Sequence, residues 1–288
     1  MTNKQDSAHG VNGNGMNGNG ANGSMQGWRT AIVASAPGSI RIRGYDTVSL
    51  MQRGSFADVI YLLHRGELPT KAQRRLIEAL LIAISDHGAG APSCAVARMV
   101  ASSNRQSVAA AVAAGVLAIG DEHGGAGAPC MEEIADCLDR VRKRQIPLAK
   151  AVTEVVNQAI AEKRRLAGFG HRVHRVKDPR IDFLFGLARK SGLAGDGIKA
   201  VLALETEIAH RIKPLPANID AALAAILYDL GFPPSAARFI FIIGRVAGIT
   251  AEVAEEYLRE KPMRVRIPVV YDGEAPRKPA RARKGVRR

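Results

Sequence analysis

The sequence predicts an all-α protein. Apolar residues recur at helical spacing through most of the 288-residue chain, the segments between them carry Gly, Pro and capping residues, and alternating strand patterns are scarce. The best strand candidate, at 264–271, contains Pro268, which predicts an extended arm instead of a paired strand. The sequence has no P-loop and no GxGxxG turn between a strand and a helix, so it gives no support to a nucleotide-binding fold.

The helices can be placed in order from their apolar spacing and their ends. A short amphipathic helix is expected at 56–63, and a second one follows Pro69-Thr70 and stops at Asp86. We expect one long helix over 95–119, rich in Ala and Val, whose small residues allow close helix contact and which Gly120 ends. Further helices are expected at 131–144, 147–166, 179–191, 196–211, 219–230 and 234–259.

The two ends of the chain differ from its body, in which hydrophobic residues are plentiful. Residues 1–27 are an Asn- and Gly-rich leader whose composition cannot offset the entropy lost on ordering, and they lack the pattern of a secretory signal. Residues 274–288 are a basic tail, in which seven Lys and Arg side chains supply half of the net charge of +14. We expect both ends to be disordered.

Apolar runs, cysteines and charge bound the class of protein. No segment reaches the ~18 uninterrupted apolar residues of a membrane span, so we expect no membrane association. Cys94, Cys130 and Cys137 are odd in number and form no CxxC pair, which favours a reducing cytoplasm over a disulfide framework. Nonspecific attraction of the basic tail to phosphates is the only route to nucleic acid that we expect.

Unusual polar residues gather in four breaks between the predicted helices. The first, SDHGAG at 85–90, places His87 just past a helix C-terminus, where it either caps carbonyl groups or contacts a ligand. The second, GDEHGGAG at 120–127, follows His123 with two glycines, which make either a flexible turn or a close approach for a ligand. The acidic residues beside His123 are consecutive with it, so the side chains diverge and no metal site is predicted.

The other two breaks add cations and an acid. In FGHRVHRVKDPR, at 169–180, Asp178 is a good N-cap for a helix that starts at Pro179. This loop is either solvated or a site for phosphates and a carboxylate, through Arg172, Arg175, Lys177 and Arg180. In PANID, at 216–220, Asp220 precedes an apolar helix and is either a cap or a general base.

These four motifs occur in the order found in the citrate synthase family, which the chain resembles from about Gly38 to Gly273. The resemblance is carried by GSIRIRGYDTVSL, FADVIYLLHRGELPT, SDHGAGAPSCAVARMVASS, IGDEHGGAG, GFGHRVHRVKDPR and NIDAAL. It implies a large helical domain at 28–125 and 223–273, a smaller mobile helical domain at 126–222, and a homodimer with active sites between the domains.

The resemblance also implies roles for individual residues. The positions that match the family's catalytic set are His123, His171 and Asp220. The positions that match substrate-binding residues are His87, Arg180, Arg245 and Arg266. The family supplies the last of these from the neighbouring subunit, although Ile267 stands here where a proline is usual.

The implied chemistry takes place at the α-carbon of a coenzyme A thioester and needs no metal. Asp220 exchanges a proton with that carbon, while His123 donates to the enolate oxygen that forms in the transition state. His171 acts on the ketone of a 2-oxo acid or, in reverse, on the tertiary hydroxyl of citryl-CoA. The residues expected to bind the phosphates of coenzyme A are Arg172, Arg175 and Lys177.

Citryl-CoA lyase is the main hypothesis, and citrate or 2-methylcitrate synthase is the alternative. The chain is shorter than a typical synthase, VAAGVLAIGDEHGGAG resembles a stretch of the ATP-citrate lyase module, and Gly90 replaces an asparagine usual in synthases. The retained His123 argues the other way, because that module has a different residue there. Cleavage of a related acyl-CoA, such as citramalyl-CoA, is open too, as is a non-catalytic member that binds nucleic acid through its tail.

Overall fold

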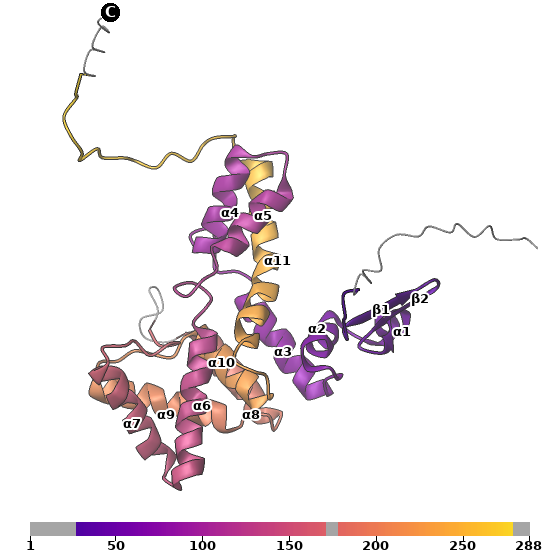
Figure 1. Ribbon diagram of the computed structural model, residues 1–288, viewed down its shortest axis with the longest axis vertical. Helices are drawn as coiled ribbons and strands as arrows, with labels where there is room; N and C mark the ends of the chain where they lie inside the picture. The colour runs from indigo at the N-terminus through magenta and orange to yellow at the C-terminus, as the bar shows by residue number, and fades with distance from the viewer. Residues whose placement is uncertain (1–26, 171–177, 279–288) are drawn as a thin grey trace, which may run out of the picture.

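The computed structural model describes residues 27–170 and 178–278, and helices dominate this part of the chain (Figure 1). The prediction of an all-α protein is confirmed. The helices are α1 (Thr47–Arg53), α2 (Phe56–Arg65), α3 (Lys71–Ile84), α4 (Pro92–Ser103), α5 (Val108–Leu117), α6 (Gly127–Arg144), α7 (Leu148–Ala161), α8 (Pro179–Lys190), α9 (Asp196–Arg211), α10 (Ile219–Asp229) and α11 (Ala236–Arg259). None of the helices described is long and apolar enough to cross a bilayer.

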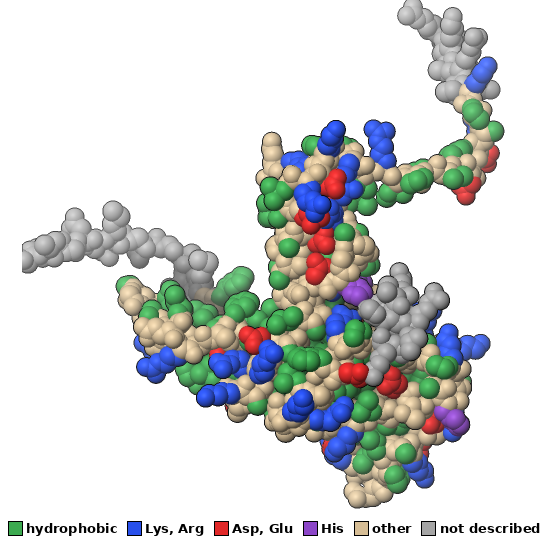
Figure 2. All heavy atoms as spheres, turned by 180° about the vertical axis from the view of Figure 1, so that it is seen from behind, with side chains coloured by type: hydrophobic (Ala, Val, Ile, Leu, Met, Phe, Trp, Pro, Cys, Tyr) green, Lys and Arg blue, Asp and Glu red, His purple; other side chains and the backbone are tan. Residues whose placement is uncertain are grey.

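A small antiparallel sheet that the sequence did not predict precedes the helices. Its strands are β1 (Val33–Ala36), β2 (Ser39–Ile42) and β3 (Tyr45–Asp46), in that spatial order, with Val33 opposite Ile42. Hydrophobic side chains are exposed over this sheet and over α1, as Figure 2 shows: Ile32, Val33, Ile40, Tyr45, Val48 and Met51. The strands are too short and too exposed to give a clear alternating pattern.

The long helix predicted over 95–119 is wrong, because the chain breaks there into α4 and α5. Asn104 ends α4, and the Ser107 side chain caps α5 by accepting the Ala110 N–H at 3.2 Å. The break places Arg105 at the end of α11, where its guanidinium donates to the Glu256 carbonyl at 3.1 Å and to the Tyr257 carbonyl at 2.9 Å. Both α4 and α5 therefore pack against α11.

Helix α10 is the centre of the fold. It packs against α6, α8 and α9 and also touches α3 and α11, and its residues 221–227 are all fully buried. Helix α11 runs from this group to α4 and α5 (Figure 1). The first turn of α10 and the middle of α11 carry Asp220 and Arg245, so the core itself fixes the backbone of two predicted site residues. The division into a large domain and a smaller mobile domain stays a prediction.

The chain beyond α11 is extended and runs away from the helices (Figure 1). Its start is held to α4 and α11: the Met263 N–H donates to the Ser102 carbonyl at 2.9 Å, and Arg264 Nε donates to Glu256 at 2.8 Å. Beyond this point Val269 and Val270 are exposed. The predicted extended arm at 264–271 is confirmed, because none of its residues is assigned to a strand.

Candidate functional site

His123 sits in a tight turn after α5. The Gly120 N–H donates to the His123 carbonyl at 2.9 Å, and the His123 N–H donates back to the Gly120 carbonyl at 3.0 Å. The next residue, Gly124, has φ +74°, and a Cβ there would lie 2.2 Å from the Phe241 ring. Glycine is thus required at 124, and the turn presents the His123 imidazole edge-on to Phe241, with ring centroids 6.2 Å apart.

The hydrogen bonds of His123 fix where its proton lies. The Ser93 N–H donates to Nε2 at 3.2 Å, and the Ser93 hydroxyl lies 2.9 Å from the same nitrogen. Because a backbone N–H can only donate, Nε2 is an acceptor and the neutral ring carries its hydrogen on Nδ1. Burial, together with the charges of Arg245 and His87, lowers the pKa of His123 to about 4. At neutral pH His123 is therefore a neutral Nδ1–H donor.

Asp220 lies in the first turn of α10, where Asn218 supplies the cap. The Asn218 Oδ1 accepts the Asp220 N–H at 2.9 Å and the Ala221 N–H at 3.4 Å, so the Asp220 side chain is not needed as a cap. Its Oδ1 atom is buried and has no hydrogen-bond partner among the described residues. Burial raises the pKa of Asp220 to about 6, against the opposing effects of Arg180 and Arg245. This carboxyl can both accept and release a proton near neutral pH.

Arg245 connects the two groups. It is only 3% exposed on α11, donates from Nε to the Ile84 carbonyl at 3.0 Å, and reaches the Ser93 hydroxyl from Nη1 at 3.3 Å. Its guanidinium lowers the pKa of both His123 and Asp220, so both side chains lie within its electrostatic range. Burial lowers the pKa of Arg245 itself. Residues from three distant parts of the sequence thus surround one buried cation.

Arg180 and His87 approach the same region from α8 and from the end of α3. The guanidinium of Arg180 forms a two-point ion pair with Asp178, at 2.9 and 2.7 Å, and donates to the Ala83 carbonyl at 3.0 Å. This pairing holds the arginine in one orientation and leaves only its remaining N–H groups for a ligand. His87 is exposed, and its electrostatic effect on His123 indicates that it lies nearby.

Other predicted residues do not meet this group in the described structure. The positions that lie outside the described residues are His171, Arg172, Arg175 and Lys177. Arg266 is exposed on the extended C-terminal segment, which leaves the subunit from the α4–α11 end (Figure 1). Its predicted role, in the active site of a neighbouring subunit, stays a prediction.

A basic cavity borders residue 170, and sequence reasoning missed it. It has a volume of about 370 Å³ and combines cations from two loops with apolar side chains from α9 and the segments beside it. Its walls are formed by Arg164, Arg165, Leu166, Phe169, Ile208, Ile212, Lys213 and Leu215. The sequence predicted a helix over 147–166, but α7 ends at Ala161 and frees the two arginines. The signal available was the basic cluster EKRR before Gly168.

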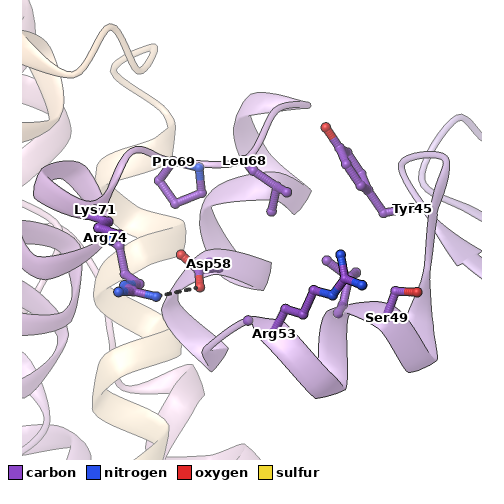
Figure 3. A pocket seen from close by; sticks show the side chains of 10 residues that line it. Tyr45, Ser49, Arg53, Asp58, Leu68, Pro69, Lys71 and Arg74 are labelled. Atoms are coloured by element: carbon purple, nitrogen blue, oxygen red, sulfur yellow. Dashed lines mark hydrogen bonds and ion pairs between the residues drawn. The ribbon is translucent and has the colours of Figure 1, made fainter.

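Two further groups contain none of the predicted site residues, and the second of them lies close to Arg245. A cavity of about 330 Å³ opens among α1, α2 and α3, with Arg53 and Lys71 on its wall beside an ion pair of Arg74 with Asp58 at 3.4 Å (Figure 3). It contains none of the predicted site residues. Its lining joins the ends of neighbouring helices in the N-terminal part of the chain.

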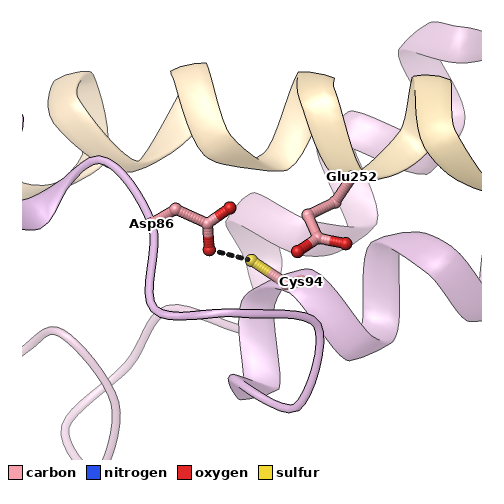
Figure 4. A group of neighbouring side chains, drawn as sticks. All are labelled: Asp86, Cys94 and Glu252. Atoms are coloured by element: carbon pink, nitrogen blue, oxygen red, sulfur yellow. Dashed lines mark hydrogen bonds between the residues drawn. The ribbon is translucent and has the colours of Figure 1, made fainter.

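The second group is Asp86, Cys94 and Glu252 (Figure 4). The Cys94 thiol lies 3.5 Å from Asp86, and burial raises its pKa to about 11, which disfavours the thiolate that a metal requires. Glu252 pairs with Arg98 at 2.5 Å, and Asp86 accepts the Gly88 N–H at 2.8 Å. Each side chain therefore has a structural role, and the absence of a metal from the site stays a prediction.

Comparison with known proteins identifies the family. The family model for the citrate synthase C-terminal domain matches residues 72–266. The chain is 32% identical over 222 residues to the citrate synthase of Haloferax volcanii, covering 76% of this chain and 55% of that one. It is 31% identical over 197 residues to the 2-methylcitrate synthase of Mycobacterium tuberculosis, covering 66% and 47%. The chain spans about half the length of the curated relatives it matches.

Solved structures extend this comparison. Citryl-CoA lyase from Hydrogenobacter thermophilus superposes with a TM-score of 0.79 at 38% identity, covering 87% of this chain and 96% of that one. The citrate synthase of Thermoplasma acidophilum, solved with carboxymethyl coenzyme A and oxaloacetate, superposes with a TM-score of 0.64 at 27% identity, covering 78% and 59%. With the family model matched over the segments that carry His123, Asp220 and Arg245, the chain belongs to the citrate synthase family.

Proposed function

We propose that the protein is a citryl-CoA lyase, which cleaves citryl-CoA to acetyl-CoA and oxaloacetate. The observation that carries this proposal is the arrangement around Arg245 of a neutral imidazole donor and a carboxyl whose pKa lies near neutrality. The likeness to the Hydrogenobacter thermophilus lyase over nearly the whole length of that chain favours cleavage. The alternative, citrate or 2-methylcitrate synthase, is favoured by the curated relatives.

Three side chains, His171, His123 and Asp220, account for the proton transfers and the charge that forms during cleavage. His171 takes the proton of the tertiary hydroxyl of citryl-CoA while the adjacent carbon–carbon bond breaks, which leaves oxaloacetate. The bonding electron pair moves into the thioester, and the Nδ1–H of His123 stabilises the enolate oxygen. Protonated Asp220 then delivers its proton to the α-carbon and gives acetyl-CoA. In the synthase direction each proton moves the opposite way.

The remaining residues bind the substrate. Arg245, Arg180 and His87 hold carboxylates, and Arg266 of a second copy completes the site. The cavity beside residue 170 suits an adenine ring with phosphates, because it joins apolar walls to Arg164 and Lys213. The coenzyme A phosphates would also meet the cations at 172, 175 and 177.

The proposal includes a homodimer in the cytoplasm. The exposed hydrophobic side chains over the sheet and α1, and those of the C-terminal segment, are two separate surfaces that a second copy would cover. The three cysteines are free thiols and are fully buried, which fits a reducing compartment.

A product assay separates the hypotheses. Synthetic citryl-CoA is supplied to the full chain, and its products are followed by liquid chromatography. Oxaloacetate with acetyl-CoA supports the lyase, whereas citrate with free coenzyme A supports the synthase. Consumption at the rate of the buffer alone would reject both enzymes in favour of a non-catalytic member of the family. Deleting residues 277–288 then tests the tail, which we expect to leave turnover unchanged.

A further inference from the structure

Two short segments connect the proposed base, Asp220, to residue 170. Segment 167–170 and segment 216–218 lie side by side: the Gly170 N–H donates to the Pro216 carbonyl at 2.7 Å, and the Asn218 N–H donates to the Gly168 carbonyl at 2.9 Å. The Asn218 side chain also donates from Nδ2 to the Gly170 carbonyl at 2.9 Å. The same side chain caps α10, so this pair of segments sets the start of the helix that carries Asp220.

Each segment is anchored by a carboxylate from a different helix. Glu133, on α6, accepts the Ala167 N–H at 3.1 Å and pairs with Arg164 at 2.6 Å. Glu205, on α9, accepts the Ala217 N–H at 2.8 Å. Glutamates on helices usually face solvent, yet Glu133 is only 7% exposed, so the fold sustains the cost of desolvating it. Burial raises the pKa of Glu133 to about 7, although Arg164 and the Ala167 N–H favour its charged form.

Segment 167–170 packs closely against the first turn of α10. Gly168 has φ +84°, and a Cβ there would lie 2.9 Å from the Ala221 Cβ and 3.0 Å from the Cys130 sulfur. Segment 167–170 therefore has no room to move toward α10 without displacing Ala221, the neighbour of Asp220. A shift in either anchor would be transmitted to the Asp220 carboxyl through the backbone and through the Asn218 cap.

We propose that Glu133 and Glu205 are positioning residues that clamp segment 167–170 to segment 216–218 and thereby hold the Asp220 carboxyl in its reactive place. The inference rests on the proposed function only in naming Asp220 as the group that moves the proton. The clamp itself is a statement about two hydrogen-bonded segments, and it can be tested without any substrate.

The kinetic test compares substitutions that keep or remove each acceptor. Glu133→Gln keeps an oxygen for the Ala167 N–H, while Glu133→Ala and Glu205→Ala remove the acceptor. We expect each alanine variant to lower kcat on citryl-CoA by about 10-fold to 100-fold, with KM changed by less than about threefold, because displacement of a catalytic group by ~1 Å costs this much. Glu133→Gln should recover most of kcat. Any remaining effect should fall on KM, because Gln weakens the ion pair with Arg164, which lines the cavity proposed for coenzyme A.

The matched control is Asp229, at the C-terminal end of α10, the helix that carries Asp220 in its first turn. Its carboxylate accepts the N–H groups of Gly195 at 2.8 Å, Gly197 at 2.7 Å and Ile198 at 3.2 Å, so it is also a partly buried carboxylate that holds backbone N–H groups, here at the start of α9. Asp229→Asn should leave kcat unchanged. A loss of kcat there as large as in Glu133→Ala would overturn the proposal, because any damage to α10 would then have the same effect.

Hydrogen exchange measured by mass spectrometry supplies the readout that is independent of activity. Peptides covering 164–170 and 214–222 should both exchange faster in Glu133→Ala and in Glu205→Ala than in the parent protein, and Glu133→Gln should lie between. Faster exchange confined to the segment that the removed carboxylate touches would overturn the clamp. If the parent protein does not turn over citryl-CoA, the proposed function fails while the exchange result still decides the clamp. If Glu133→Ala does not fold, Glu133→Gln and Glu205→Ala carry the test.

Discussion

The two ends of α10 carry aspartates in opposite situations. At its C-terminal end, Asp229 accepts three backbone N–H groups from the N-cap and first turn of α9, so both of its oxygens have partners. At its N-terminal end, the Oδ1 of Asp220 is buried without a partner among the described residues, because Asn218 has taken over the capping. Burial raises the pKa of both carboxyls. The difference indicates that Asp229 stabilises the fold, and it supports the proposed role of Asp220 in contacting a ligand.

The largest expected effect comes from Asp220→Asn. It removes the only carboxyl that we assign to proton transfer at the α-carbon, so we expect turnover of citryl-CoA to fall by about 100-fold or more. The melting temperature should stay the same or rise, since a desolvated carboxylate destabilises the folded state when one of its oxygens, here Oδ1, has no partner among the described residues. Steady-state kinetics and a thermal melt on the same sample check both points. Near-normal turnover would remove Asp220 from the mechanism.

The next largest effect is expected in the pH dependence of catalysis by Asp220. The pKa of Asp220 is raised from its ordinary 3.8 to about 6, so the folded protein binds this proton more tightly than the unfolded chain. Cleavage needs the protonated acid, and its kcat/KM should fall up to tenfold per unit as pH rises above about 6. Proton abstraction from acetyl-CoA needs the carboxylate and should rise over the same range, as exchange of its methyl protons with D₂O can show.

The raised pKa of Asp220 also makes the free energy of unfolding depend on pH. The stabilising effect of the raised pKa is fully present below about pH 4 and is lost as pH rises through about 6. Asp220→Asn should therefore gain stability relative to the parent protein across this window, measured by urea unfolding at each pH. An unchanged difference between the two proteins from pH 4 to pH 7 would contradict the assigned pKa.

A smaller effect is expected at Ser93. Its hydroxyl lies between His123 Nε2 and Arg245 and is fully buried, while its backbone N–H also donates to Nε2. Ser93→Ala removes the hydroxyl and keeps the N–H, so the tautomer of His123 should persist and turnover should fall by about 10-fold, the cost of one buried hydrogen bond. Nitrogen NMR of the ring reports the tautomer directly. A change of protonated nitrogen in this variant would show that the hydroxyl, and not the N–H, sets it.

Ser93 also shows why the sequence predicted some of the site and not the rest. His123 and Asp220 are detectable because each breaks a run of apolar or small residues at a predicted helix end. Ser93 lies 30 residues before its partner in a stretch of small residues, and the packing of α4 against α5 brings it to His123. In the sequence, Glu133 resembles a solvent-facing residue of α6. Its burial depends on residues 162–170 folding back after α7, which no local pattern predicts.

The fold shows the same division between local and tertiary signals. Helix starts at Ser55 and Thr70 follow local rules, since both residues form capping boxes. The break between α4 and α5 was missed because the apolar pattern continues on both sides of it, and because Arg105 finds its carbonyl partners at the end of α11, about 150 residues away in sequence.

The smallest expected effect on activity is that of Asp229→Asn, and it tests the other half of the comparison. The amide keeps one oxygen, which can accept from Gly195 and Ile198, and then turns its NH₂ group toward the Gly197 N–H, from which it cannot accept. We expect the free energy of unfolding to fall by about 1–3 kcal/mol, as for a buried donor left without a partner. Urea unfolding at pH 7 measures this loss, and turnover should be unchanged. If Asp229→Asn were as stable as the parent protein, three hydrogen bonds would not distinguish the two aspartates. The lack of a partner for Asp220 Oδ1 among the described residues could then no longer be ascribed to function.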